Sequence, residues 1–298
     1  MAIADKLNEL LIQKNNLVDN LNAMGVSSSK DEKLTTLVPK VLEIKTGGSS
    51  DEWKDVLIDL MDNKGANVKK LPDELTEIGY YALAYREDMV LDELPSGLKS
   101  IGGYGLRSCT SLNLKKFPDS ITTIGSNACR GCTELALTEL PKDLKTMGTY
   151  AFAECPKLAI TEIPLGVTLL DQYLFYESTG IEKMTLHENI QTFNQRVFYG
   201  CTNLKAVDVQ NPNITSLAGY TFYNCTSLEA LIVRATKPPT ITTTTFTNTP
   251  IAKGTGYVYV YDEVVSAYQS YTNWSRYASQ ILPLSQLPKE IKEMLQLW

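Results

Sequence analysis

The sequence predicts an elongated α+β repeat protein, a β-solenoid whose coils recur every 23 positions, with helical segments at both ends. Two observations support this fold class. An apolar residue followed by proline recurs at this period, and a cysteine followed three positions later by an apolar residue recurs in the same register. Residues one period apart should therefore lie in columns along a single axis, separated by the spacing of adjacent strands.

Apolar anchors define the register of the coils. They are Leu71-Pro72, Leu94-Pro95, Phe117-Pro118, Leu140-Pro141 and Ile163-Pro164, and Leu186-His187 continues the series. A second apolar column follows seven positions later, at Ile78, Ile101, Ile124, Met147, Leu170 and Phe193. Short apolar alternations at both places predict two short strands in each coil. Proline ends the first strand because it cannot donate to a β-ladder.

A corner follows the second strand. Glycine occupies this place at Gly79, Gly102, Gly125 and Gly148, where we expect it to supply a positive φ angle. An aromatic residue and a small-then-large pair come next, as in Tyr150-Ala151-Phe152. The large side chain should point into the core, and the small one should let neighbouring coils approach.

The cysteines belong to the same pattern. Cys109, Cys132, Cys155 and Cys201 are separated by whole multiples of the period, and Cys225 comes one position late. A free thiol is small and readily buried, so a thiol column packs the core without any covalent bond. We expect no disulfides, because no export signal is visible at the start of the chain.

These columns combine into the consensus LPxxLxxIGxYAFxxCxxL. This consensus resembles the BspA-like leucine-rich repeats of bacterial surface proteins, whose motif runs LPxSVxxIGxxAFxxCxxL, over residues 70–250. The resemblance implies a leucine-rich-repeat β-solenoid. The sequence departs from the motif at Arg86 and Ser178, which replace the cysteine, and at Asp171, which replaces the glycine.

Residues 251–298 are expected to form a strand-helix cap. Alternation in residues 257–261 predicts a strand, and a short helix should follow with Asp262 as its N-cap. This piece resembles the closing unit of such repeat arrays. A cap is physically required, because an open solenoid end would expose strand edges and apolar surface.

Residues 1–45 are expected to form a helical segment that anchors or oligomerises the chain. An a/d pattern of a short coiled coil is formed by Leu7, Leu10, Leu17, Leu21 and Met24. The segment resembles one found near the start of fibre and tail-associated proteins of bacteriophages and prophages. Residues 46–69 then predict a flexible linker and an N-terminal capping helix around Trp53.

Composition and charge exclude several functions. The net charge of -6 is spread along the chain without a Lys/Arg cluster, so we expect no nucleic-acid partner. No apolar run approaches the ~18–20 residues that span a bilayer, and the first residues lack the features of a signal peptide. We therefore expect neither a membrane span nor a signal peptide.

We expect no enzymatic activity, no cofactor and no metal. The single histidine, His187, occupies the proline position of the repeat, and no Ser-His-Asp arrangement can be assembled around it. Cys129 and Cys132 form a CxxC pair, but both fall on core positions of the repeat, which disfavours zinc binding and redox chemistry. The glycines recur singly, unlike those of a phosphate-binding loop.

Two columns are candidate ligand-binding surfaces. The first is Tyr81, Tyr104, Tyr150, Tyr173 and Tyr220, broken by Asn127 and Arg196. Its rings could stack on sugars or form a contact surface, although mutual stacking in the coil wall is the simpler interpretation. The second is Glu93, Lys116, Glu139, Glu162, Thr185 and Asp208. Its carboxylates could attract a cationic partner, although a solvated face with interleaved lysines is the simpler interpretation.

The leading hypothesis is a bacteriophage virion protein of tail or fibre type, made in the host cytoplasm. Its N-terminal helices would bind other virion proteins and form a homo-oligomer, for example a trimer. The solenoid would recognise a carbohydrate or protein on the host cell surface. The alternative hypothesis is a BspA-like adhesin on a bacterial cell surface. An enzyme is a third class that no catalytic constellation in the sequence supports.

Overall fold

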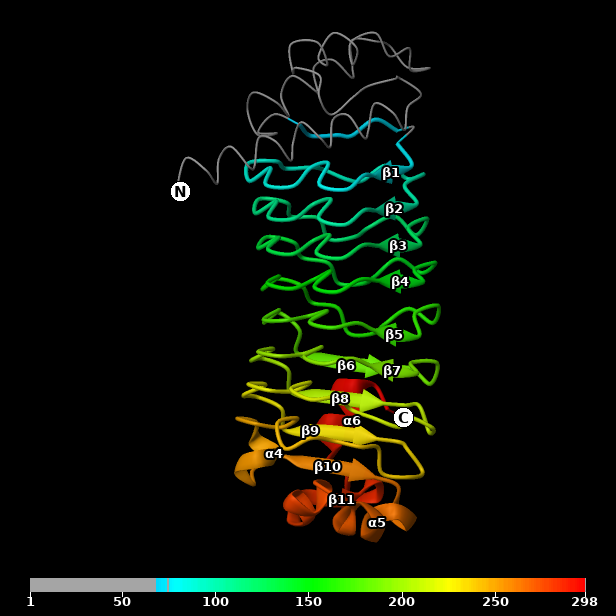
Figure 1. The fold of residues 1–298 in the computed structure, drawn as a ribbon, viewed down its shortest axis with the longest axis vertical. Helices are drawn as coiled ribbons and strands as arrows, with labels where there is room; N and C mark the ends of the chain where they lie inside the picture. Colours follow the sequence, from blue (N-terminus) through cyan, green and yellow to red (C-terminus); the bar gives the residue numbers. More distant parts are fainter. Residues whose placement is uncertain (1–67, 74, 298) are drawn as a thin grey trace.

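The computed structural model describes residues 68–73 and 75–297. In this part the chain forms a parallel β-solenoid of about nine turns, stacked along one long axis (Figure 1). The predicted fold class is confirmed. The helices expected in residues 1–45 and the linker and capping helix expected up to residue 67 lie outside the described residues.

The second apolar column forms a ladder of two-residue strands. A parallel four-stranded sheet contains β1 (Glu77–Ile78), β2 (Ser100–Ile101), β3 (Thr123–Ile124) and β4 (Thr146–Met147). The ladder continues with β5 (Leu169–Leu170), which pairs with β7 (Thr192–Phe193). Paired residues in adjacent strands lie one period apart, as Ile78 and Ile101 do, and the second residue of each two-residue strand is buried. The register predicted from the repeat is therefore correct.

The first predicted strand forms only in the later coils. A parallel five-stranded sheet contains β6 (Lys183–Leu186), β8 (Ala206–Val209), β9 (Ala230–Val233), β10 (Tyr257–Val260) and β11 (Ile281–Pro283). In these coils the proline is replaced, and the backbone N–H groups of Gln210 and Arg234 donate to Leu186 and Val209 at 2.9 and 3.0 Å. Proline lacks this donor, so the prediction of two strands in every coil is wrong for the earlier coils.

Columns of identical side chains fill the core. Phe152, Phe175, Phe198, Phe222 and Phe246 are fully buried, and neighbouring ring centroids lie 5.5–6.2 Å apart. All six cysteines are free and buried. The thiols of the five cysteines in the repeat column each donate to a carbonyl of the preceding coil, as Cys132 Sγ does to the Leu106 carbonyl at 3.0 Å. Burial raises the pKa of the Cys201 thiol, so this side chain stays protonated and packs the core.

The corner glycines have a different role from the predicted one. The positive φ angles do not fall on Gly102, Gly125 or Gly148. A Cβ atom added at Gly125 would lie 2.6 Å from the nitrogen of Gly103 in the preceding coil. Glycine is needed here because the backbones of adjacent coils approach too closely for a side chain. The positive φ comes two positions later, on the tyrosine column.

The C-terminal cap closes the last coil. After α4 (Pro250–Lys253) and β10, the chain forms η1 (Asp262–Val264), α5 (Val265–Ser270) and η2 (Trp274–Gln280). Trp274 is fully buried against Phe246, and its Nε1 donates to the Pro239 carbonyl at 2.6 Å. Asp262 is not the predicted N-cap, because its carboxylate instead accepts the Ser285 backbone N–H at 3.1 Å.

The end of the chain folds back over the outer face of the solenoid. After η3 (Leu284–Gln286), α6 (Lys289–Leu295) packs against β6 and β8 (Figure 1). Ile291 and Leu295 join a second apolar cluster with Ala206 and Ile232. Among the described residues, no helix is long enough and apolar enough to cross a lipid bilayer.

Candidate binding surface

The tyrosine column lies at the turn that follows the second strand, and its backbone is left-handed. The φ angles are 59° for Tyr81, 60° for Tyr104, 58° for Tyr150, 56° for Tyr173 and 60° for Tyr220. A left-handed conformation costs a residue with a side chain about 1–2 kcal/mol, whereas glycine adopts it freely. Each of these coils therefore holds a tyrosine at a place where glycine would fold more easily.

The rings of this column stack on one another and on arginines. Ring centroids lie 4.3 Å apart for Tyr81 and Tyr104, and 4.2 Å apart for Tyr150 and Tyr173. The break at Arg196 is filled by its guanidinium, which lies 5.2 Å from the Tyr173 centroid and 4.4 Å from that of Tyr220. Because the ring faces are covered, ring edges and hydroxyl groups are the parts of these half-buried side chains left for a ligand.

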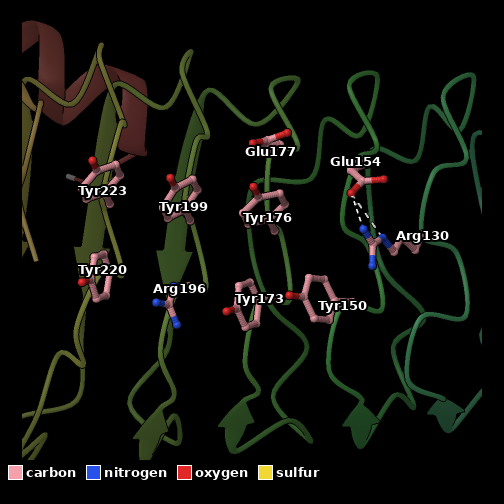
Figure 2. A pocket seen from close by; sticks show the side chains of 10 residues that line it. All are labelled: Arg130, Tyr150, Glu154, Tyr173, Tyr176, Glu177, Arg196, Tyr199, Tyr220 and Tyr223. Carbon is pink, nitrogen blue, oxygen red and sulfur yellow. Dashed lines mark hydrogen bonds and ion pairs between the residues drawn. The ribbon is translucent and has the colours of Figure 1, made fainter. Parts of the chain in front are cut away.

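A second aromatic row runs beside the first (Figure 2). Tyr176, Tyr199 and Tyr223 stack with centroid distances of 5.0 and 4.9 Å. The rows touch, since the ring centroids of Tyr173 and Tyr176 lie 5.7 Å apart. This row was not predicted from the sequence. It could have been found, because each member follows the first column by three positions and recurs with the period of the repeat.

The two rows border an open hollow of about 480 Å³ that extends from Arg130 to Tyr223 (Figure 2). We call this the tyrosine surface; its members are Arg130, Tyr150, Glu154, Tyr173, Tyr176, Glu177, Arg196, Tyr199, Tyr220 and Tyr223. Tyr81 and Tyr104 continue the first row beyond it. Arg130 pairs with Glu154 at 2.7 Å, and its guanidinium lies 4.8 Å from the Tyr150 centroid. Two arginines and two glutamates line the hollow, so its charges balance.

Three phenols of the tyrosine surface, those of Tyr150, Tyr176 and Tyr199, have raised pKa values. A hydrogen bond to Glu177, together with burial, raises the pKa of Tyr176 to about 12. Burial and the neighbouring Tyr173 hydroxyl raise the pKa of Tyr150, and burial raises that of Tyr199. A protonated phenol both donates and accepts hydrogen bonds. The surface therefore presents a regular set of neutral hydrogen-bonding groups.

The acidic column does not form one continuous surface. Glu93, Glu139 and Glu162 are exposed, and Lys116 pairs with Glu139 at 2.9 Å. Asp208 is fully buried and accepts from Arg234 Nε at 2.9 Å and from Gln210 Nε2 at 3.0 Å. The prediction that Asp208 belongs to a ligand-binding surface is therefore wrong, because α6 and Arg234 cover the outer face of β8.

The residues considered for catalysis and metal binding have structural roles. His187 Nδ1 accepts the Asn189 backbone N–H at 3.2 Å, which leaves Nε2 to donate to the Pro164 carbonyl at 3.0 Å. Cys129 and Cys132 are buried side by side in the core. Within residues 68–73 and 75–297, no group of three or more His, Cys, Asp or Glu side chains is arranged to hold a metal ion.

A stack of parallel coils with repeated leucine, phenylalanine and cysteine columns defines a leucine-rich-repeat protein. The model of the BspA type leucine rich repeat region matches residues 63–182 and 145–256, and the chain belongs to this family. Comparison with curated protein sequences found no match.

Solved leucine-rich-repeat structures resemble parts of this chain. A leucine-rich repeat protein from Bacteroides ovatus is 19% identical with a TM-score of 0.44, over 64% of this chain and 54% of that protein. A leucine rich repeat protein from T. pallidum is 25% identical with a TM-score of 0.48, over 58% of this chain and 77% of that protein. A leucine rich cell surface protein from Faecalibacterium prausnitzii is 19% identical with a TM-score of 0.33, over 54% of this chain and 58% of that protein. The chain thus spans about half the length of the Bacteroides ovatus protein.

Proposed function

We propose that this protein is a non-catalytic adhesin of a bacterial cell surface, which binds its ligand through the tyrosine surface. Membership of the BspA-type family favours this role over the virion hypothesis, because its repeats resemble those of bacterial surface proteins. Solenoids bind through extended faces built from repeated positions, and the tyrosine surface is such a face.

The observation that carries the proposal is a comparison of two left-handed columns within the same turns. The second column lies four positions after the first, and two of its seven members are glycine: Tyr85, Ser108, Gly131, Glu154, Glu177, Gly200 and Asn224. The tyrosine column contains no glycine. Glycine therefore occurs at some left-handed positions of these turns but at none of the first column, which keeps tyrosine or arginine at its positions that line the hollow.

Cell binding by surface variants tests the proposal. The full chain and a Tyr199→Ala/Tyr223→Ala variant would be labelled and incubated with a panel of bacterial and epithelial cells, and bound protein measured by flow cytometry. We expect the variant to lose most of the binding, because truncation of a tyrosine that is a hot spot of an interface costs about 2 kcal/mol or more, which corresponds to about thirtyfold in affinity.

A matched control removes exposed tyrosines elsewhere. Tyr257 and Tyr271 are 36% and 41% exposed and lie in the C-terminal region. A Tyr257→Ala/Tyr271→Ala variant should bind like the unchanged protein. Equal binding by both double variants, with native circular dichroism, would remove the tyrosine surface from the proposal.

The virion hypothesis rests on residues 1–45, which lie outside the described residues, and the family match gives it no support. Oligomerisation through Leu7, Leu10, Leu17, Leu21 and Met24 is the part of it that can be tested directly. Light scattering would compare the full chain with one that starts near Ser50. An oligomer that becomes monomeric on truncation supports N-terminal anchoring, and a monomer in both cases contradicts a trimeric fibre.

A further inference from the structure

We propose that the ligand of the tyrosine surface is a linear, uncharged polysaccharide whose chain runs parallel to the solenoid axis. This inference rests on the proposed function and adds the chemical class and the direction of the ligand. The length, the hydrogen-bonding groups and the charge balance of the hollow support it.

The length of the hollow favours an extended ligand. Arg130 and Tyr223 lie four coils apart along the axis (Figure 2). With about 4.8 Å between adjacent coils, this separation is about 19 Å. The first row adds a tyrosine or arginine at each coil from Tyr150 to Tyr220. A ligand that contacts the whole surface must therefore be extended and must offer similar groups at regular intervals.

The exposed groups match the hydroxyls of a sugar chain. Ring faces within each row are covered by neighbouring rings or by Arg196, so a ligand meets phenol hydroxyls and ring edges. Each protonated phenol can accept a hydrogen bond from a sugar hydroxyl, and a phenol can also donate one unless its proton is already engaged, as the Tyr176 proton is with Glu177. The Glu177 carboxylate and the Arg196 guanidinium each have the geometry to bind two adjacent hydroxyls.

The charge balance disfavours ionic polymers. Glu154 and Glu177 lie along one side of the hollow, and Arg196 lies in the row on the other side (Figure 2). A polyanion filling the hollow would approach both carboxylates, and a polycation would approach both arginines. Like charges brought together at an interface weaken binding, and an uncharged polymer avoids both penalties.

An extended peptide fits less well, because the backbone of the turn is already engaged. Peptides commonly bind by adding a strand to a free sheet edge. Here the Tyr173 N–H donates to the Gln195 carbonyl at 3.1 Å and the Phe175 N–H to the Val197 carbonyl at 2.9 Å, each in the next coil. A ligand of the tyrosine surface must therefore be recognised mainly by side chains.

Competition and chemical treatment of cells test the ligand class. Binding of the full chain to the cell panel would be measured after periodate oxidation, which cleaves vicinal diols, and separately after protease treatment. Soluble dextran, mannan and xylan would serve as uncharged competitors, with dextran sulfate and chitosan as charged ones. We expect periodate to abolish binding, protease to leave it, and at least one uncharged polymer to compete better than either charged one.

A hydroxyl-deletion variant connects this result to the tyrosine surface. Tyr176→Phe/Tyr199→Phe/Tyr223→Phe keeps the stacked rings and removes three hydroxyls. We expect binding at least about tenfold weaker, since one hydrogen bond contributes a few-fold in affinity. Tyr257→Phe/Tyr271→Phe is the matched control and should bind normally.

The outcomes separate this inference from the proposed function. Binding that survives periodate but is lost after protease, or that a charged polymer inhibits best, would overturn the polysaccharide while leaving the adhesin in place. Unchanged binding by the triple phenylalanine variant would overturn recognition through phenol hydroxyls. Failure to bind any cell surface would count against the proposed function itself.

Discussion

Ser178 shows what the cysteine column requires of a single residue. Its hydroxyl donates to the Phe152 carbonyl at 2.5 Å, as the Cys201 thiol donates to the Phe175 carbonyl at 3.1 Å. It also accepts the Cys155 backbone N–H at 3.1 Å. The cysteine column therefore tolerates any small side chain that can donate a hydrogen bond to the preceding coil. Ser178 departs from the consensus but preserves that bond.

Substitution of Ser178 separates volume from hydrogen bonding. Ser178→Ala should lower the free energy of unfolding by about 1–3 kcal/mol, because it leaves a buried carbonyl and a buried N–H without this partner. Ser178→Cys, which restores the consensus, should cost less than about 1.5 kcal/mol. Urea unfolding followed by circular dichroism measures both. Equal losses would show that the hydrogen bonds contribute nothing specific.

Tyr176 makes stability depend on pH at the alkaline end. Its pKa is raised from 10.0 to about 12 in the folded protein. The folded state holds this proton more tightly than the unfolded state, so the contribution is complete below about pH 10 and is lost as pH rises towards 12. Tyr176→Phe should therefore lose less stability across this interval. Parallel urea titrations at several alkaline pH values would detect the difference, and identical slopes would contradict it.

At the scale of one coil, the corner between strand and turn depends on close backbone approach. A Cβ atom at Gly148 would lie 2.5 Å from the nitrogen of Ser126 in the preceding coil. At Gly97, in another turn, the same atom would meet nothing within 4 Å. The two glycines therefore differ in what they contribute to the packing of the coils.

Alanine substitution tests this difference. Gly148→Ala should destabilise the protein by about 1–3 kcal/mol, because adjacent coils must move apart. Gly97→Ala should be neutral or slightly stabilising, by up to about 1 kcal/mol, since it restricts the unfolded chain. Urea unfolding midpoints give the comparison. A Gly148→Ala protein as stable as the Gly97→Ala protein would refute close approach as the reason for this glycine.

At the scale of the whole molecule, a solenoid is stabilised mainly by contacts between neighbouring coils, so its ends matter most. Trp274 covers the last coil: it packs against Phe246 with a centroid distance of 5.8 Å and against Tyr268 at 5.2 Å. The Tyr268 hydroxyl also donates to the Ala235 carbonyl at 3.1 Å. The cap thus extends the aromatic core column to its end.

Loss of the Trp274 side chain should destabilise the C-terminal end of the solenoid. Trp274→Ala should cost about 3–5 kcal/mol, and the coils nearest the cap should open first. Hydrogen exchange should rise between residues 222 and 260 and stay unchanged between residues 100 and 150. Tyr271→Ala, at a 41% exposed residue, is the control. A uniform rise along the chain would instead indicate one cooperative unit.

The sequence by itself determined the period, the parallel register, the buried columns and the need for a cap. These follow from local spacing, because a residue repeated every 23 positions in a stack of equal coils must meet its equivalent in the next coil. The first tyrosine column was predicted for the same reason, and so were its breaks at Asn127 and Arg196.

The tertiary structure decided what these columns do. Only packing of adjacent backbones shows that Gly125 is needed for close approach, and only the turn geometry brings Tyr176 and Tyr199 beside Tyr173 and Arg196. The fold-back of α6 over β8, with the burial of Asp208, joins segments that lie far apart in the chain and share no repeat. A periodic sequence specifies neighbours along the axis, whereas contacts across a turn or between the cap and a strand depend on three-dimensional geometry that the period does not contain.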